Sequence, residues 1–224
     1  AANEFLMREA YRWDFVTLDG AAVKSSSGLP VLPSCRLRDH PGGAFLFVVS
    51  SYDVRSFATQ ATSRALRAAA RRFQRIAAMD TGAWLMANAG LLGGAKATIH
   101  WDELTAFSET FGEVEAVAER YVIEDQRITC GGAMAAFDLA LDLIGRTHGE
   151  ALRLEVAALF LHQATEAPQD RIHRHRTSPL VENASPKCPR RWRRRLRSET
   201  SPCVSGRHNE RWPVRFKPSS EQRR

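Results

Sequence analysis

The chain has 224 residues, 44% hydrophobic and 25% charged, which suits one α/β domain with an appendage and excludes a fibre or a wholly disordered chain. It has no apolar run of the ~18 residues that a transmembrane helix needs, and its first residues lack the basic-then-apolar pattern of a secretory signal. The net charge of +7 is unevenly divided, because residues 1–170 carry 16 Lys and Arg against 21 Asp and Glu, whereas residues 171–224 carry 16 against 4.

The first part of the chain predicts short elements, then a buried strand and a long helix. In chain order we expect a helix end at 1–11, a strand at 12–18, a return strand at 22–24, a loop at 25–33, a strand at 44–50 and a helix at 54–78. The run AFLFVVS is apolar throughout, which is typical of a strand buried on both faces of a parallel sheet.

The second part alternates strands with helices. The pattern predicts a strand at 76–79, a helix at 83–89 ended by Gly90, a strand at 97–100, a helix at 102–111, a strand pair at 121–124 and 128–130, and helices at 133–145 and 150–163. This alternation predicts a doubly wound, mostly parallel sheet, in which ligands bind beyond the carboxyl ends of the strands. Two strand-to-helix junctions of this kind lie near Asp80 and Cys130.

The sequence MDTGAW predicts a sharp turn that pushes the side chain of Asp80 out at the top of the sheet. Small residues after the turn allow the helix to lie close to the strands, as in a nucleophile elbow. Backbone N–H groups at Thr81 and Gly82 would then point at a bound group. His100 follows at the end of the next predicted strand and could face Asp80.

Simpler interpretations of these residues remain open. Asp80 could serve only as a helix cap, and His100 could be a satisfied, buried histidine. Trp84 and Trp101 could belong to the core or could hold a quaternary ammonium by cation–π attraction. Cys130 is interpreted first as a small buried hydrophobe. We predict a ligand site formed by Asp80, Thr81, Gly82, Trp84, His100, Tyr52, Cys130 and Gly131, with no catalytic residue, cofactor or metal.

Residues 1 to about 165 resemble the amidotransferase-like (PfpI-like) sensor half of AraC-family transcriptional regulators, in the GlxA-like group. The matching strings include YRWDFVTLDG, DTGAWLMANAGLLGGAKATIHWDEL, ITCGGAMAAFDLALDLI and HGEALRLEVAALFL. The resemblance implies a flavodoxin-like fold of the class I glutamine amidotransferase type and a homodimer. A cytoplasmic location is expected separately, because the cysteines show no disulfide pattern. The DTGAW variant looks most like regulators for arginine, glycine betaine or carnitine use.

The departures from this family shape the predicted function. Catalytic relatives carry cysteine at the elbow, where this chain has Asp80, so a thiol mechanism is not expected. A carboxylate at a helix N-terminus is stabilised as an anion and suits a cationic ligand. The strand that opens the sheet in relatives would lie before Ala1, so we expect the first strand to be missing and the free edge to favour aggregation.

The last part of the chain differs from the rest in its composition and charge. We expect a sensor domain at 1–165, a linker at 166–184 and a basic tail at 185–224 that is disordered or arises from a frameshift. The tail lacks the helix-turn-helix units of the family, so DNA binding should be weak and non-specific, if any. The run RRWRRRLR could bind phosphate, but a solvated charge run is the simpler interpretation.

We therefore predict a non-enzymatic, metabolite-sensing domain of an AraC-family regulator for an amino-acid-like or quaternary-ammonium ligand. The alternatives are a PfpI-like hydrolase or hydratase with His100 as base, and a basic protein that binds nucleic acid through its tail. The four cysteines, Cys35, Cys130, Cys188 and Cys203, lie far apart, so neither a disulfide framework nor a zinc site is expected.

Overall fold

The computed structural model describes residues 1–25 and 27–161. The predicted linker and tail, and the end of the predicted helix at 150–163, therefore lie outside the described residues. The elements of the first half are α1 (Ala2–Phe5), β1 (Val16–Thr17), β2 (Val23–Lys24), β3 (Pro30–Val31), β4 (Cys35–Arg36), η1 (Leu37–Asp39), β5 (Gly43–Ser50), α2 (Val54–Phe57), α3 (Gln60–Ala70) and β6 (Phe73–Asp80). Those of the second half are α4 (Gly82–Asn88), β7 (Lys96–Ala97), α5 (Leu104–Thr110), β8 (Glu115–Ala116), β9 (Tyr121–Glu124), β10 (Arg127–Cys130), α6 (Ala133–His148) and α7 (Glu150–Leu159).

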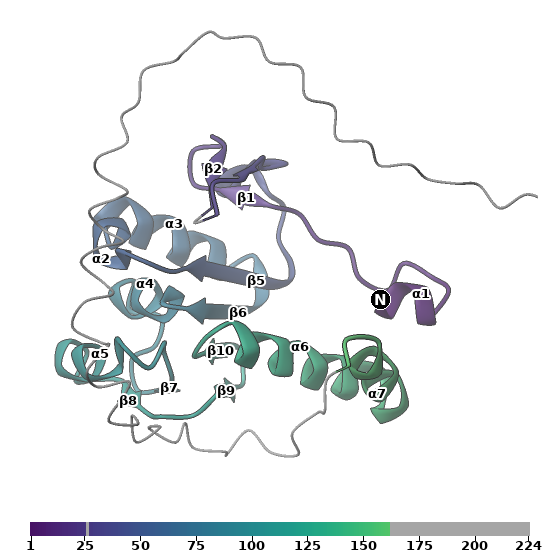
Figure 1. The fold of residues 1–224 in the computed structure, drawn as a ribbon. Helices are drawn as coiled ribbons and strands as arrows, with labels where there is room; N and C mark the ends of the chain where they lie inside the picture. Colours follow the sequence, from purple (N-terminus) through teal and green to yellow (C-terminus); the bar gives the residue numbers. More distant parts are fainter. Residues whose placement is uncertain (26, 162–224) are drawn as a thin grey trace, which may run out of the picture. The chain divides into compact units, whose positions relative to one another are not determined.

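The main sheet of the described residues has four strands in the order β5-β6-β10-β9 (Figure 1). β5, β6 and β10 run parallel, and β9 is antiparallel to β10. The short pairs β1-β4 and β7-β8 are also parallel. The architecture is thus α/β with a mostly parallel, flavodoxin-like sheet, which confirms the predicted fold class.

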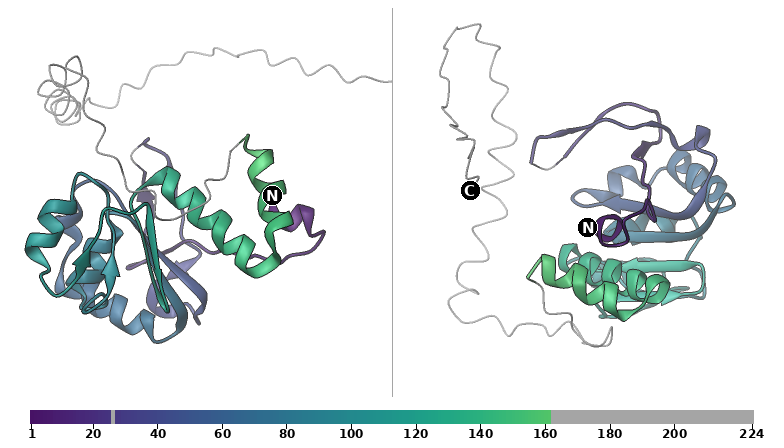
Figure 2. Two further views of the ribbon diagram at one scale, coloured as in Figure 1. Left: turned by 90° about the horizontal axis from the view of Figure 1, so that it is seen from below. Right: turned by 90° about the vertical axis from the view of Figure 1, so that its right-hand side faces the viewer.

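Two layers of side chains cover the sheet. On one face Leu46, Val48, Ile76 and Ala78 pack with residues of α3 and α4 in the largest hydrophobic cluster. On the other face Ala77 and Cys130 pack with Leu139 of α6. A smaller hydrophobic cluster joins α1, α6 and α7, and α1 and α7 lie side by side near one end of α6 (Figures 1 and 2). None of the described helices is both long and apolar enough to cross a bilayer.

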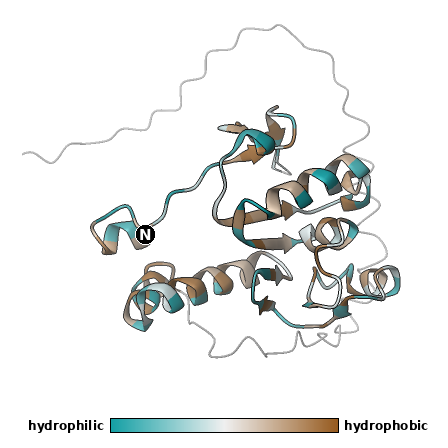
Figure 3. Ribbon diagram, turned by 180° about the vertical axis from the view of Figure 1, so that it is seen from behind, coloured by the Kyte–Doolittle hydropathy of each residue, from teal (hydrophilic) through white to brown (hydrophobic). Residues whose placement is uncertain are grey.

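β5 departs from the sequence prediction, because only one of its faces is covered. Leu46 and Val48 are buried, but Phe47 and Val49 on the opposite face are 46% and 75% exposed. α6 packs over β6, β9 and β10 and leaves β5 uncovered at the edge of the described sheet. The hydrophobic residues that follow one another along β5 are visible in Figure 3. The continuous apolar run predicted a strand buried on both faces, whereas β5 lies at the edge of the described sheet.

The predicted helix at 54–78 was wrong in extent. The structure has α2, a break at Thr59 whose side chain caps α3, and a strand from Phe73 onward. The last residues of the predicted helix pair with β5 on one side and β10 on the other, and Ile76, Ala77 and Ala78 are buried between them. Pairing on two sides outweighed the helical periodicity of the sequence.

Smaller corrections concern short strands. Of the strand predicted at 12–18 only Val16–Thr17 pairs, with Cys35–Arg36, and the predicted loop at 25–33 contains β3. The strand predicted at 97–100 is confined to Lys96–Ala97, whose partner β8 was not predicted. The helix at 83–89, the strand pair around Asp125 and the helix after Gly132 were predicted correctly to within a few residues.

Candidate functional site

The site forms where β6, β10 and the segment after β7 end at the same edge of the sheet. Asp80 is the last residue of β6 and Cys130 the last residue of β10. Cys130 pairs in register with Met79, next to Asp80. His100 is held beside them because its backbone N–H donates to the Asp80 carbonyl over 3.4 Å. Three of the predicted site residues therefore lie together.

The backbone at Asp80 makes the sharp turn that the sequence indicates. Its φ of 58° lies in the left-handed region, and α4 begins only two residues later. Gly82 lies so close to β5 that a Cβ atom would be 2.2 Å from the Val48 carbonyl oxygen. The close packing of α4 on the sheet thus depends on a glycine at this position.

Asp80 does not cap α4. The cap position belongs to Thr81, which makes no capping hydrogen bond with its side chain; its Oγ1 donates instead to the Ser51 carbonyl over 2.6 Å. The interpretation of Asp80 as a simple cap is therefore wrong. Thr81 and Gly82 are both buried and fix the turn by packing.

The electrostatic environment of Asp80 differs from the expected one. Burial raises the pKa of its carboxyl above the ordinary value, and His100 and the Thr81 backbone N–H offset this only in part. The sequence predicts an anion stabilised by the helix N-terminus, whereas desolvation by burial has the largest effect on the pKa of this carboxyl. A half-buried carboxylate of this kind gains most from a cation brought close to it.

His100 is half-buried and accepts a hydrogen bond on Nδ1 from the Asp102 backbone N–H over 3.4 Å. Its ring lies 5.5 Å from that of Trp101, which is 63% exposed. Gly131 is buried nearby, and its N–H donates to the Arg120 carbonyl rather than pointing at open space. Position 131 thus supports the shape of the site through its backbone.

Cys130 is fully buried, and its Sγ donates to the Gly132 carbonyl over 3.4 Å. Burial raises the pKa of this thiol to about 11. Since the thiolate is the nucleophile, Cys130 is poorly suited to attack at neutral pH. This agrees with its interpretation as a small buried hydrophobe.

Alkylation of Cys130 by iodoacetamide is expected to be slow at pH 7 and to accelerate steadily with pH. Because the pKa of the folded thiol is raised to about 11, the thiolate fraction grows about tenfold per pH unit up to pH 9.5. Peptide mapping by mass spectrometry at several pH values measures this rate, with the half-buried Cys35 as internal comparison. Alkylation of Cys130 as fast as that of Cys35 at pH 7 would contradict the structure.

The predicted aromatic residues lie in different environments. Trp84 is 6% exposed and packs edge-on against Phe111, with ring centroids 5.2 Å apart, so it belongs to the core. Tyr52 is 81% exposed, beyond the end of β5. These aromatic side chains therefore do not form an open cage for a cation around Asp80.

Two residues near the site had no signal in the sequence. The guanidinium of Arg55, in α2, lies 4.2 Å from the centroid of the Trp84 ring and forms two hydrogen bonds to the carboxylate of Glu103. They are 48 residues apart in the chain, and no local pattern links them.

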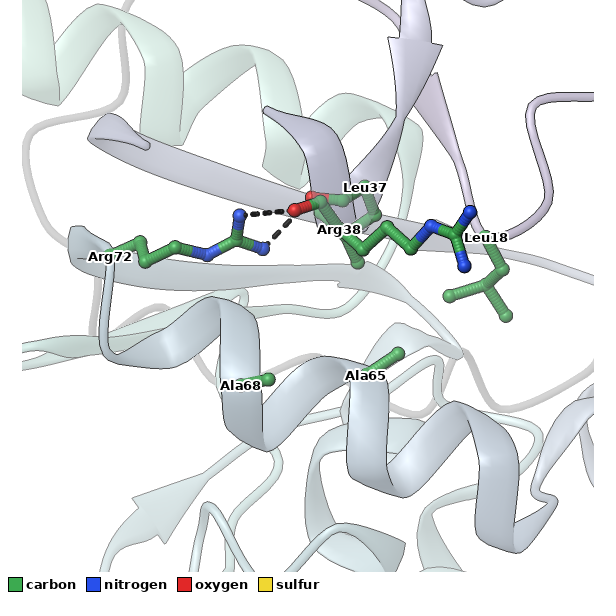
Figure 4. A pocket seen from close by; sticks show the side chains of 6 residues that line it. All are labelled: Leu18, Leu37, Arg38, Ala65, Ala68 and Arg72. Atoms are coloured by element: carbon green, nitrogen blue, oxygen red, sulfur yellow. Dashed lines mark hydrogen bonds between the residues drawn. The ribbon is translucent and has the colours of Figure 1, made fainter. Parts of the chain in front are cut away.

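A cavity of about 440 Å³ lies elsewhere in the domain, between α3 and the segment that contains η1 (Figure 4). Its lining residues are Leu18, Leu37, Arg38, Ala65, Ala68 and Arg72. The guanidinium of Arg72, in the turn after α3, donates to the carbonyls of Leu37, Arg38 and His40 and so links this segment to that turn. The cavity contains none of the predicted site residues. In the described part of the chain no three His, Cys, Asp or Glu side chains are grouped to hold a metal ion.

Comparison with known proteins supplies the remaining evidence. The model of the DJ-1/PfpI family matches residues 2–146. The chain is 34% identical over 179 residues to the HTH-type transcriptional regulator GbdR of Pseudomonas aeruginosa, covering 80% of this chain and 48% of GbdR. It is 35% identical over 169 residues to the HTH-type transcriptional regulator CdhR of the same species, covering 75% of this chain and 50% of CdhR.

The fold is also found among solved structures. An AraC family transcriptional regulator from Pseudomonas putida superposes with a TM-score of 0.57 at 20% identity, covering 71% of this chain and 85% of that structure. Similarity at this level of identity supports the fold. The chain spans about half the length of the curated relatives it matches.

Proposed function

Because this chain belongs to the DJ-1/PfpI family, we propose that it is the ligand-sensing domain of an HTH-type transcriptional regulator. The curated relatives that match most of its length carry that name. Since the chain spans about half of each, the DNA-binding half of such a regulator would be supplied outside the region of similarity. DNA is then the partner of the whole regulator, and binding by this chain itself would be weak.

The observation that carries this proposal is the carboxylate at the elbow. Asp80 stands on the turn between β6 and α4, half-buried, with His100 beside it. A small cation that enters would offset the desolvation of the Asp80 carboxylate. We infer a ligand of the amino-acid-like or quaternary-ammonium class, which combines such a cation with a small body.

Sensing is favoured over catalysis by the state of the nucleophiles. Asp80 holds the elbow position, and the Cys130 thiol is buried with a pKa of about 11. A PfpI-like hydrolase would need an activated nucleophile beside a base. Within this proposal the domain forms a homodimer in the cytoplasm, and ligand binding shifts how paired DNA-binding domains are presented.

Ligand binding is expected to raise the melting temperature of the purified chain. A compound that binds only the native state shifts the midpoint upward with concentration. We would measure this by thermal shift with arginine, glycine betaine and carnitine, each at several concentrations and constant ionic strength. The Asp80→Asn variant is expected to lose the shift, because asparagine keeps the left-handed backbone but removes the charge.

Asp125→Asn is the matched control. Asp125 also has a left-handed φ, of 44°, but lies exposed in the turn between β9 and β10. It should retain the full shift. An Asp80→Asn variant that melts cooperatively and responds to every ligand like the parent would overturn the proposed site, and turnover of a compound by the purified chain would favour the enzyme instead.

A further inference from the structure

The guanidinium of Arg55 is bound like a ligand. Its Cζ lies 4.2 Å from the centroid of the Trp84 ring, and its two terminal nitrogens donate to the two carboxylate oxygens of Glu103 over 3.3 and 2.8 Å. An aromatic face combined with a carboxylate that accepts two parallel hydrogen bonds is a strong recognition arrangement for a planar cation. Proteins use the same chemistry to bind small organic cations.

The Trp84 ring and the backbone of Glu103 are both well anchored. Trp84 lies in α4, is 6% exposed and packs against Phe107 and Phe111. The backbone of Glu103 is fixed because its N–H donates to the His100 carbonyl and its own carbonyl accepts from Phe107 at the start of α5. The Trp84 ring is therefore held by the core, and the Glu103 carboxylate is carried on a fixed backbone.

The cation is held far less firmly. The Arg55 side chain is 52% exposed, whereas that of Glu103 is 26% exposed. The backbone of α2 is anchored by Val54, which is 1% exposed, and by hydrogen bonds from Ser56 to the Asp53 carbonyl. The long Arg55 side chain can thus leave the Trp84 ring by rotation about its own bonds, while α2 stays in place.

We propose that Trp84 and Glu103 form a subsite for a guanidinium group, and that Arg55 occupies it until a ligand displaces it. The subsite is linked to Asp80 through the backbone, since the Glu103 N–H donates to the His100 carbonyl and the His100 N–H donates to the Asp80 carbonyl. The existence of a natural ligand for this subsite rests on the proposed sensing function. The binding test with a small guanidinium probe does not depend on that function. A guanidinium fits better than a quaternary ammonium, because only the former can donate hydrogen bonds to both Glu103 oxygens.

The test follows Trp84 fluorescence in the full chain during titration with N-methylguanidinium. The other four tryptophans are replaced by phenylalanine; Trp13 and Trp101 are 71% and 63% exposed, and Trp192 and Trp212 lie outside the described residues. In the Arg55→Ala variant we expect saturable binding, at least tenfold tighter than with Arg55 in place. Tetramethylammonium, which cannot donate hydrogen bonds, should bind at least fivefold more weakly.

Three further variants make the result decisive. Adding Glu103→Gln to Arg55→Ala should weaken N-methylguanidinium binding at least fivefold, because the acceptor of both hydrogen bonds loses its charge. The control Arg64→Ala removes an exposed arginine of α3 and should behave like the parent. Arg55→Gln replaces Arg55→Ala if the latter fails to melt cooperatively. A folded variant without saturable binding, or with binding insensitive to Glu103→Gln, would refute the subsite and leave the role of Asp80 untouched.

Discussion

Replacing Gly82 by alanine is expected to destabilise the domain by about 3 kcal/mol or more, at the upper end of the range for overpacking. The added Cβ would lie 2.2 Å from the Val48 carbonyl oxygen and 3.2 Å from its carbon, and both atoms belong to the backbone of β5. Backbone within a paired strand cannot swing aside as a flexible side chain can. Equilibrium unfolding in urea, followed by far-UV circular dichroism, measures the loss.

Gly112→Ala is the matched control for this experiment. No atom lies within 4 Å of a Cβ at position 112, and the residue is exposed. The free energy of unfolding should therefore change by no more than about 1 kcal/mol, and could rise because alanine restricts the unfolded chain. Equal effects at both positions would mean that α4 does not approach β5 as closely as the structure has it.

Arg120→Met is expected to cost about 3–5 kcal/mol, as is typical when one partner of a buried ion pair is removed. Arg120 forms an ion pair with Asp138, whose side chain is 8% exposed inside α6, whereas that of Arg120 is 21% exposed. Loss of the guanidinium leaves the Asp138 carboxylate in a largely dry environment without that charge. The same urea titration gives the free energy of unfolding.

The double variant Arg120→Met, Asp138→Leu separates charge from packing. Removing both charges should recover most of the lost stability, because apolar pairs of similar volume replace buried ion pairs at little cost. The control is Arg146→Met, which removes an arginine that is 58% exposed from its pair with Asp142 and should cost less than about 1 kcal/mol. If Arg120→Met cost no more than Arg146→Met, the buried pair would not be a major source of stability.

The elbow could be predicted from the sequence because its determinants are local. An apolar strand that ends in Asp80, followed by Thr81-Gly82 and alanines, indicates a sharp turn into a closely packed helix, and the structure has this turn. The sequence also predicted that His100 could face Asp80, but for a different reason from the one the structure shows. The strand before His100 pairs with β8 and not with β6, and His100 lies beside Asp80 through its backbone hydrogen bond to the Asp80 carbonyl.

Other features depend on contacts between distant residues and could not be predicted. The sequence left open whether Trp84 belongs to the core or holds a cation. Its ring packs against Phe107 and Phe111 in the core and also lies 4.2 Å from the Arg55 guanidinium, which is distant in the chain. The apolar face of β5 was expected to be covered, but coverage depends on where α6 crosses the sheet. The helix predicted at 54–78 ran through β6 because helical periodicity carries no information about strand pairing.

The left-handed backbone at Asp80 has a consequence for attempts to engineer this domain. For residues other than glycine this conformation costs about 1 kcal/mol or more, and Asp53, the residue before α2, also has a left-handed φ, of 57°. Glycine at position 80 would relieve that cost and erase the carboxylate in one step. Directed evolution that selects for heat resistance alone would therefore favour loss of this carboxylate, on which the ligand binding proposed above depends. Any such selection has to assay ligand binding at the same time.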